Sequence, residues 1–158
     1  MLRSVFRPLW PLLLLPVLVS SASAEMLFQV SRSSATTPTD FYSTSCRISS
    51  TGFVVIERSV WLWGTQDTLR SVETKNVKLS AKTLRSAIEQ LSYGNISGNM
   101  LIGGGAHMYL AYQLQKDGSK KEILVSDEFG GVRNDSPLVK PLKTFIDGVC
   151  GQIPAPGA

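Results

Sequence analysis

The stretch YSTSCRISSTGFVVIERSVWLW, residues 42–63, decides the fold that this sequence predicts. Its first part alternates between the two sides of an extended chain, with Tyr42, Cys46 and Ile48 on one side and Ser43, Ser45 and Arg47 on the other. Such alternation is typical of a strand with one solvated face. Residues 49–52 read Ser-Ser-Thr-Gly, which favours a turn, and the β-branched and aromatic run 53–63 follows. We therefore expect an antiparallel hairpin here.

Further strand patterns lie on both sides of this hairpin. Residues 26–30 predict a short first strand, residues 33–40 a loop, and residues 71–79 a weaker strand. Two more strands, 108–115 and 121–127, flank Asp117-Gly118, which is the strongest hairpin signal in the chain. Their expected core faces are Leu110, Tyr112 and Leu114 on the first strand, and Ile123 and Val125 on the second.

Two helices are predicted from their caps and their apolar spacing. Ser80 caps the first helix and Gly94 follows its end, and its apolar stripe consists of Leu84, Ala87, Ile88 and Leu91. The second begins with Ser136 as cap and Pro137 at the first helical position, and its stripe consists of Leu138, Leu142, Phe145, Ile146 and Val149. Pro141 conflicts with this helix because proline has no backbone N–H to donate. The Gly-rich residues 95–106 predict a long mobile connection.

This order of elements predicts an α+β fold. We expect a single domain over residues 25–150, with one antiparallel sheet of about five or six strands packed against two helices on one face. Residues 151–158 predict a flexible tail.

The first 24 residues have the three regions of a secretory signal peptide. Arg3 and Arg7 make a positive start, residues 9–19 are almost wholly apolar, and Ala22-Ser23-Ala24 supplies the cleavage site. The apolar run is shorter than the roughly 20 residues of a membrane span, so we expect no span. Cleavage before Glu25 predicts a periplasmic or secreted protein.

The cysteines agree with export. Cys46 and Cys150 are the only two, and an oxidising compartment would join them in a single disulfide. Closing this loop is worth about 4–5 kcal/mol as an upper figure in the loop-entropy model. A redox-active pair usually has its cysteines two residues apart, and a metal site needs more ligands, so a structural bridge is the favoured interpretation.

The charge balance argues against nucleic-acid binding. Removal of residues 1–24 takes away two arginines and lowers the formal net charge from +4 to +2. The remaining basic residues form no stripe, and the cluster of Lys116, Lys120 and Lys121 falls on the predicted turn at Asp117-Gly118.

Residues able to carry catalysis are few. His107 is the only histidine and stands beside Gly103-Gly104-Gly105, so a surface residue is favoured over a catalytic one. The glycines lack the following Lys and Ser/Thr of a phosphate loop, and no spacing supports a metal site or cofactor. Carboxylates gather near the C-terminus, where a pair at a defined separation could hydrolyse glycosides: Asp127, Glu128, Asp135 and Asp147.

Trp61 and Trp63 are the most suggestive residues for binding. In a strand they project from one face together with Phe53 and Val55, while the opposite face is also apolar. Such a strand is either covered on both faces or exposes aromatic rings to a partner, and the first alternative is the simpler one. We keep Trp61, Trp63 and His107 as a candidate partner surface.

The second half of the chain resembles a known family. The stretch from Tyr109 through Asp117-Gly118 to Asp127, with the helical residues 84–91 and 138–149, resembles emfourin-type bacterial inhibitors of thermolysin-like metalloproteases. The chain is also similar to exported bacterial proteins that end in a Phe-Ile-Asp-x-x-Cys helix, here residues 145–150. The predicted export, the cysteine pair and the first hairpin depart from the inhibitor pattern, and no inhibitory residue is transferred.

Two functional classes remain open from the sequence. The favoured one is an exported noncatalytic binding module of unknown ligand, such as a hydrolase inhibitor or an envelope accessory protein, whose partner is a protein or a cell-envelope component. The alternative is a small secreted hydrolase that uses acidic residues or His107. A cleft that holds His107 with two carboxylates would favour the second class.

Overall fold

The computed structural model describes residues 24–35, 40–62, 64–98, 105–127 and 131–151. The predictions for Trp63, Glu128, the glycine-rich segment 99–104, the tail from residue 152 and the signal peptide up to Ser23 lie outside these residues.

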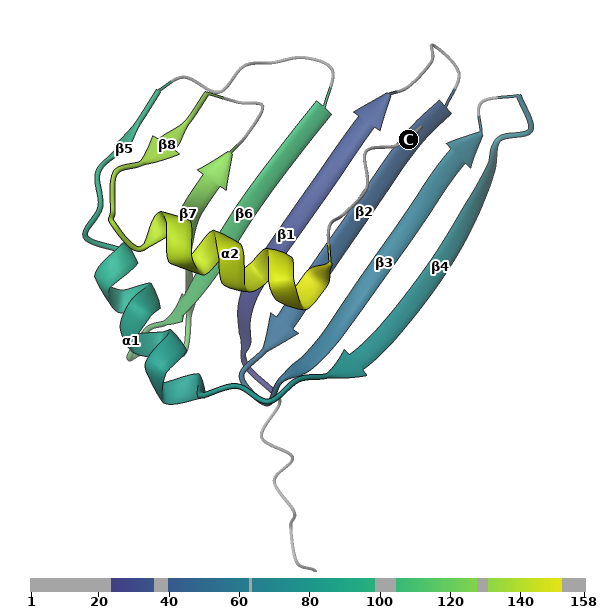
Figure 1. Ribbon diagram of the computed structural model, residues 1–158. Coiled ribbons are helices and arrows are strands. Elements are labelled where there is room, and N and C mark those ends of the chain that lie inside the picture. The colour runs from purple at the N-terminus through teal and green to yellow at the C-terminus, as the bar shows by residue number, and fades with distance from the viewer. Residues whose placement is uncertain (1–23, 36–39, 63, 99–104, 128–130, 152–158) are drawn as a thin grey trace, which may run out of the picture.

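Eight strands form one antiparallel sheet in the order β4-β3-β2-β1-β6-β7-β8-β5. The elements are β1 (Met26–Ala35), β2 (Asp40–Ser49), β3 (Phe53–Leu62), β4 (Asp67–Asn76), α1 (Ala81–Leu91), β5 (Ile96–Ser97), β6 (Gly105–Leu114), β7 (Lys120–Asp127), β8 (Arg133–Asn134) and α2 (Val139–Cys150). Both helices lie on the same side of the sheet, and β3 and β4 extend past the end of α2 (Figure 1). The expected α+β fold is confirmed, and the sheet is larger than the predicted five or six strands.

The two additional strands are β5 and β8, which have two residues each and pair with one another. A two-residue strand has no periodicity to detect, which is why β5 fell inside a predicted connection. The strand β1 is also longer than predicted and runs to Ala35, so the expected loop at 33–40 begins later. Pairing with β2 along Ser33, Ser34 and Ala35 extends this polar part of β1.

The predicted central hairpin is confirmed. Strands β2 and β3 pair from Ile48↔Val54 to Asp40↔Leu62, around a turn in which the Gly52 N–H donates to the Ser49 carbonyl over 3.0 Å. Gly52 has a φ of 84°, and a Cβ there would lie 2.0 Å from the Val77 carbonyl oxygen. Only glycine meets both conditions. The neighbouring strand β4 starts at Asp67, earlier than the predicted Ser71, because it pairs along the whole of β3.

The core lies between the helices and one face of the sheet. Its centre is a row of buried side chains across neighbouring strands, in which Val30 pairs with Cys46 and Cys46 with Ile56. The helices cover this row with Ile88, Leu91, Leu142 and Ile146. Cys46 and Cys150 form the predicted disulfide, with Cα atoms 6.0 Å apart, and so attach the last residue of α2 to β2.

The predicted core face of β6 is wrong. Tyr109 and Ala111 belong to the core under the helices, whereas Leu110 is half-buried and Leu114 is 53% exposed. Tyr112 is buried, although it lies outside the main core cluster. Apolar residues occur on both faces of β6, so alternation alone does not identify the covered face. On β7 the prediction is confirmed, because Ile123 and Val125 are both buried.

The helix boundaries follow the expected chemistry with one shift. The Ser80 hydroxyl accepts a hydrogen bond from the Thr83 N–H, as predicted. α2 begins at Val139 instead of Pro137, with Leu138 as its N-cap. Pro141 is then the third helical residue, where a backbone N–H has no partner within the helix, so its missing donor costs nothing. Among the described residues, neither helix is long and apolar enough to cross a membrane.

Candidate functional site

The helices cover one face of the sheet and leave the other face of β2, β3 and β4 without a covering element among the described residues (Figure 1). We call this second surface the open face. Because side chains alternate along a strand and Val54 and Ile56 face the core, the intervening residues of β3 face the open side. Residues that pair directly on adjacent strands share a face of the sheet. The residues of β2 and β4 that pair with these β3 residues therefore also lie on the open face. The open face therefore carries Phe41, Ser45, Arg47, Phe53, Val55, Glu57, Trp61, Arg70 and Val72.

Apolar side chains are exposed at both ends of the open face. Phe41 and Phe53 are 43% and 42% exposed, and Val72 on the edge strand is 56% exposed. Trp61 pairs directly with Phe41 and is half-buried. The open face thus combines large rings that project into solvent with a tryptophan that is partly enclosed by its neighbours.

A row of charges crosses the middle of the open face. Arg47 Nη2 lies 2.8 Å from Glu57 Oε2, Arg70 Nη2 lies 2.5 Å from Glu57 Oε1, and the Ser45 hydroxyl lies 3.5 Å from Glu57 Oε2. The hydrogen bond from Arg70, followed by the charge of Arg47, lowers the pKa of the Glu57 carboxyl. The row joins β2, β3 and β4 and carries one net positive charge.

His107 does not join Trp61. It lies on the helix-covered face of β6, opposite Arg32 of β1, and only 8% of it is exposed. Its ring centroid is 4.9 Å from that of Tyr109. The Tyr109 hydroxyl donates to Asp147 Oδ1 of α2 over 2.8 Å, and Lys143 Nζ lies 5.0 Å from the Tyr109 ring centroid. His107 is thus part of the polar packing beneath α2.

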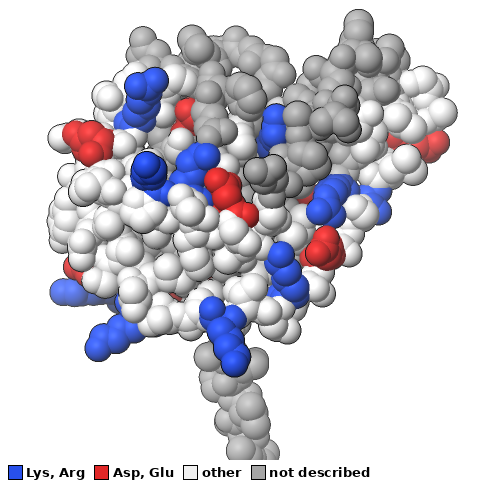
Figure 2. All heavy atoms as spheres, in the orientation of Figure 1, with Lys and Arg blue, Asp and Glu red and all other residues white. Residues whose placement is uncertain are grey.

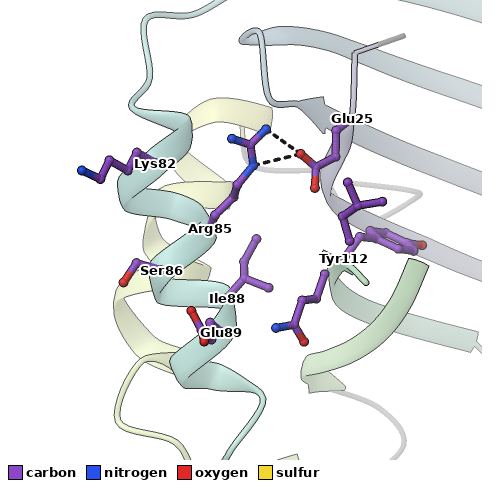
Figure 3. Close-up of a pocket in the computed structure, with 9 residues that line it drawn as sticks. Glu25, Lys82, Arg85, Ser86, Ile88, Glu89 and Tyr112 are labelled. Atoms are coloured by element: carbon purple, nitrogen blue, oxygen red, sulfur yellow. Dashed lines mark hydrogen bonds and ion pairs between the residues drawn. The ribbon is translucent and has the colours of Figure 1, made fainter. Parts of the chain in front are cut away.

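One cavity lies between α1 and the adjacent ends of β1 and β6. It has a volume of about 440 Å³ and is lined by Glu25, Lys82, Arg85, Ser86, Ile88, Glu89, Tyr112, Gln113 and Leu114. Figure 3 shows the Arg85 guanidinium turned toward Glu25 and Lys82 pointing away from the cavity. Arg85 donates from Nε and Nη2 to Glu25 Oε2 over 2.9 and 2.7 Å. The pair connects α1 to the segment just before β1, which is a structural role.

A second cavity of about 390 Å³ lies at the β7–β8 end of the sheet. Its lining includes Asp127, Arg133 and Asn134. The Asn134 side chain already forms hydrogen bonds with backbone groups. Its amide nitrogen donates to the Leu124 carbonyl over 2.8 Å, and its amide oxygen accepts from the Ser136 N–H over 2.9 Å. Asp127 is the one carboxylate among the described lining residues.

The structure does not bring a catalytic set together within the described residues. His107 lines neither cavity. Asp135 and Asp147 have structural partners, since Asp135 accepts from the Asn95 N–H over 2.7 Å and Asp147 accepts from Tyr109. In the described part of the chain, no group of three or more His, Cys, Asp or Glu residues is arranged to hold a metal ion.

Sequence reasoning missed the charged row and the Arg85–Glu25 pair. The row had a usable signal, because a hairpin turn at residues 49–52 places Ser45 opposite Glu57. The Arg85–Glu25 contact joins residues 60 positions apart on a helix and an irregular segment, and no local pattern reports such a pairing.

On the helix-covered side, basic and acidic side chains are scattered and intermixed (Figure 2). No family model, no curated protein and no solved structure matches this chain.

Proposed function

We propose that this chain is an exported noncatalytic binding module that holds a protein of the cell envelope or its surroundings on the open face. One observation carries the proposal: the helices cover only one face of the sheet, while Phe41, Phe53 and Val72 are exposed on the other. Isolated exposed apolar residues are common on soluble proteins. Several on one flat face, with a tryptophan beside them, are typical of an interaction surface.

The layout of the open face suggests what the partner offers. Phe53 and Trp61 are eight positions apart on β3, or roughly 26 Å at about 3.3 Å per residue. The charged row lies between them and has one positive charge in excess. A partner that fits has two apolar contacts separated by a polar or acidic group. This span suits a folded protein surface better than a small molecule.

Export is part of the proposal. A signal peptide that ends at Ala24 would leave the whole of β1 in the mature chain, because β1 begins at Met26. The Cys46–Cys150 bridge supports export, because disulfides form and persist chiefly in oxidising compartments. The resemblance to metalloprotease inhibitors makes a thermolysin-like protease the first purified partner to test.

The test compares two exposed apolar residues on opposite faces of one strand. Val72 belongs to the open face and Leu69 to the other side of β4, and they are 56% and 60% exposed. The oxidised chain 25–158 is used to capture partners from envelope extract, and a captured protein is then titrated in purified form. We expect Val72→Ser combined with Phe53→Ser to weaken binding at least tenfold, because it removes two exposed apolar contacts of the open face at once. Leu69→Ser should leave it unchanged.

Stability serves as the control for folding. Surface substitutions usually change the free energy of unfolding by about 0.5 kcal/mol or less, so both variants should unfold like the parent. Equal loss of binding in the Leu69→Ser variant, or full binding by the Val72→Ser/Phe53→Ser variant, would contradict the proposal.

A further inference from the structure

The two edge strands of the sheet differ in how many unpaired main-chain groups they offer to another strand. One edge is β5, which has only two residues. The other is β4, which has ten residues, pairs with β3 without a register shift and is exposed at every position except Lys75. It contains no proline, and in the described part of the chain its outer side has no paired strand. A long, regular edge of this kind presents unpaired N–H and C=O groups to another strand.

We infer that β4 pairs in antiparallel orientation with β4 of a second copy of this chain. A two-fold axis perpendicular to the sheet joins the copies edge to edge and keeps both open faces on the same side. This goes beyond the proposed function, because the edge pairs through main-chain groups of β4, whereas the open face extends over β2, β3 and β4 and shares only side chains such as Arg70 and Val72 with it. The open face stays accessible and becomes continuous across two copies.

The charges along β4 select one register. With Ser71 on the axis, Asp67 of each copy lies opposite Lys75 of the other, and no like charges are directly opposite. Within the described part of the chain, neither Asp67 nor Lys75 is in an ion pair. Both are therefore available across the interface.

The neighbouring registers are less favourable. An axis at Arg70 places the two Arg70 side chains opposite each other, and an axis at Glu73 does the same with two carboxylates. An axis at Val72 avoids like charges but places Lys75 opposite Leu69, without an ion pair. The Ser71 register overlaps residues 67–75 and forms about eight to ten main-chain hydrogen bonds. It also brings Leu69 and Val72 against the partner strand.

A charge swap tests both the partner and the register. Sedimentation velocity on the oxidised mature chain, from micromolar to near-millimolar concentration, should show a concentration-dependent dimer. In the Asp67→Lys variant, a lysine at position 67 faces Lys75 of the other copy at both symmetric contacts, which should weaken the dimer roughly tenfold or more. Lys75→Asp should weaken it similarly, because two carboxylates then face each other at each contact. The double variant Asp67→Lys/Lys75→Asp restores opposite charges and should recover dimerisation. Lys78→Asp, which lies beyond the end of β4 and changes the net charge by the same amount as Lys75→Asp, is the matched control for that variant.

Cross-linking gives a second readout of the register. Ser71→Cys places two thiols at the axis, about 5 Å apart at Cβ, and should form a disulfide-linked dimer under mild oxidation. Thr74→Cys faces Thr68 of the partner and lies far from its own equivalent, so it should cross-link much more slowly. A monomer throughout the concentration range, dimerisation unaffected by the charge variants, or equal cross-linking at positions 71 and 74 would each overturn the inference. A parent chain that dimerises but captures no partner would count against the proposed function alone.

Discussion

The strands β6 and β4 have the same length and opposite surroundings. In β6, Tyr109 and Ala111 lie in the core beneath the helices, whereas almost all of β4 is exposed. The helices cover β6 and leave β4 uncovered. In addition, β6 pairs with a strand on each side, with a register shift between Tyr109 and Leu110, whereas β4 pairs only with β3 in the described sheet. One half of the sheet is therefore stabilised by apolar burial and a disulfide. The other half is uncovered on its open face, and apart from the core residues Val54 and Ile56 of β3 it depends on strand pairing and on ion pairs.

The largest effect should come from a core residue in the covered half. Phe28 is fully buried, and its ring centroid is 5.9 Å from that of Phe145 in α2. Phe28→Ala should lower the free energy of unfolding by about 3–5 kcal/mol, because it removes a large ring and leaves a cavity. Leu69→Ala on β4 should cost about 0.5 kcal/mol or less. Chemical denaturation measures both, and similar losses would show that the two halves do not differ as described.

The disulfide should have the next largest effect. The double variant Cys46→Ala/Cys150→Ala removes the disulfide that joins the end of α2 to β2. We expect a loss of about 2–5 kcal/mol, seen as a lower melting temperature under oxidising conditions. Reduction of the parent chain should reproduce the loss. An unchanged melting temperature after complete reduction would rule out a stabilising role for the bridge.

The smallest change in the free energy of unfolding should come from the Glu57 ion pairs of the uncovered half, and it should depend on pH. Arg70 and Arg47 lower the pKa of Glu57 below its ordinary value of 4.5, so the folded state favours the carboxylate. The stabilisation is present above the unfolded pKa and is lost as pH falls through the lower folded value. Glu57→Gln should therefore be less stable than the parent at neutral pH, with the difference shrinking below about pH 4.5. Urea midpoints at several pH values measure this; a difference that grows in acid would contradict it.

The sequence predicted the elements of this fold better than it predicted their surroundings. The central hairpin, the Ser80 cap and the Cys46–Cys150 bridge each depend on local signals or on having only two cysteines. The buried face of β6 was predicted wrongly because both faces of that strand carry apolar residues, and packing against the helices decides between them.

The sequence also did not predict on which face of the sheet the candidate site residues lie. Trp61 and His107 seemed to belong together as the aromatic and ionisable residues of one surface, yet they lie on opposite faces of the sheet. Their separation follows from the register of three strand pairs, β3 with β2, β2 with β1 and β1 with β6. A shift of one residue in any of these pairs would reverse the result, and the sequence does not specify each register to that accuracy.

The disulfide also determines how the chain would respond to mechanical tension. A force applied between the two termini passes directly from Cys46 to Cys150 through the bridge, so the loop of residues 47–149 between them bears no load. Only the segments outside the bridge can lengthen. The longer structured one contains β1, which is held on one edge by β2 and on the other by β6. Stretching the oxidised chain would thus require the extraction of a central strand before any helix or edge strand is pulled.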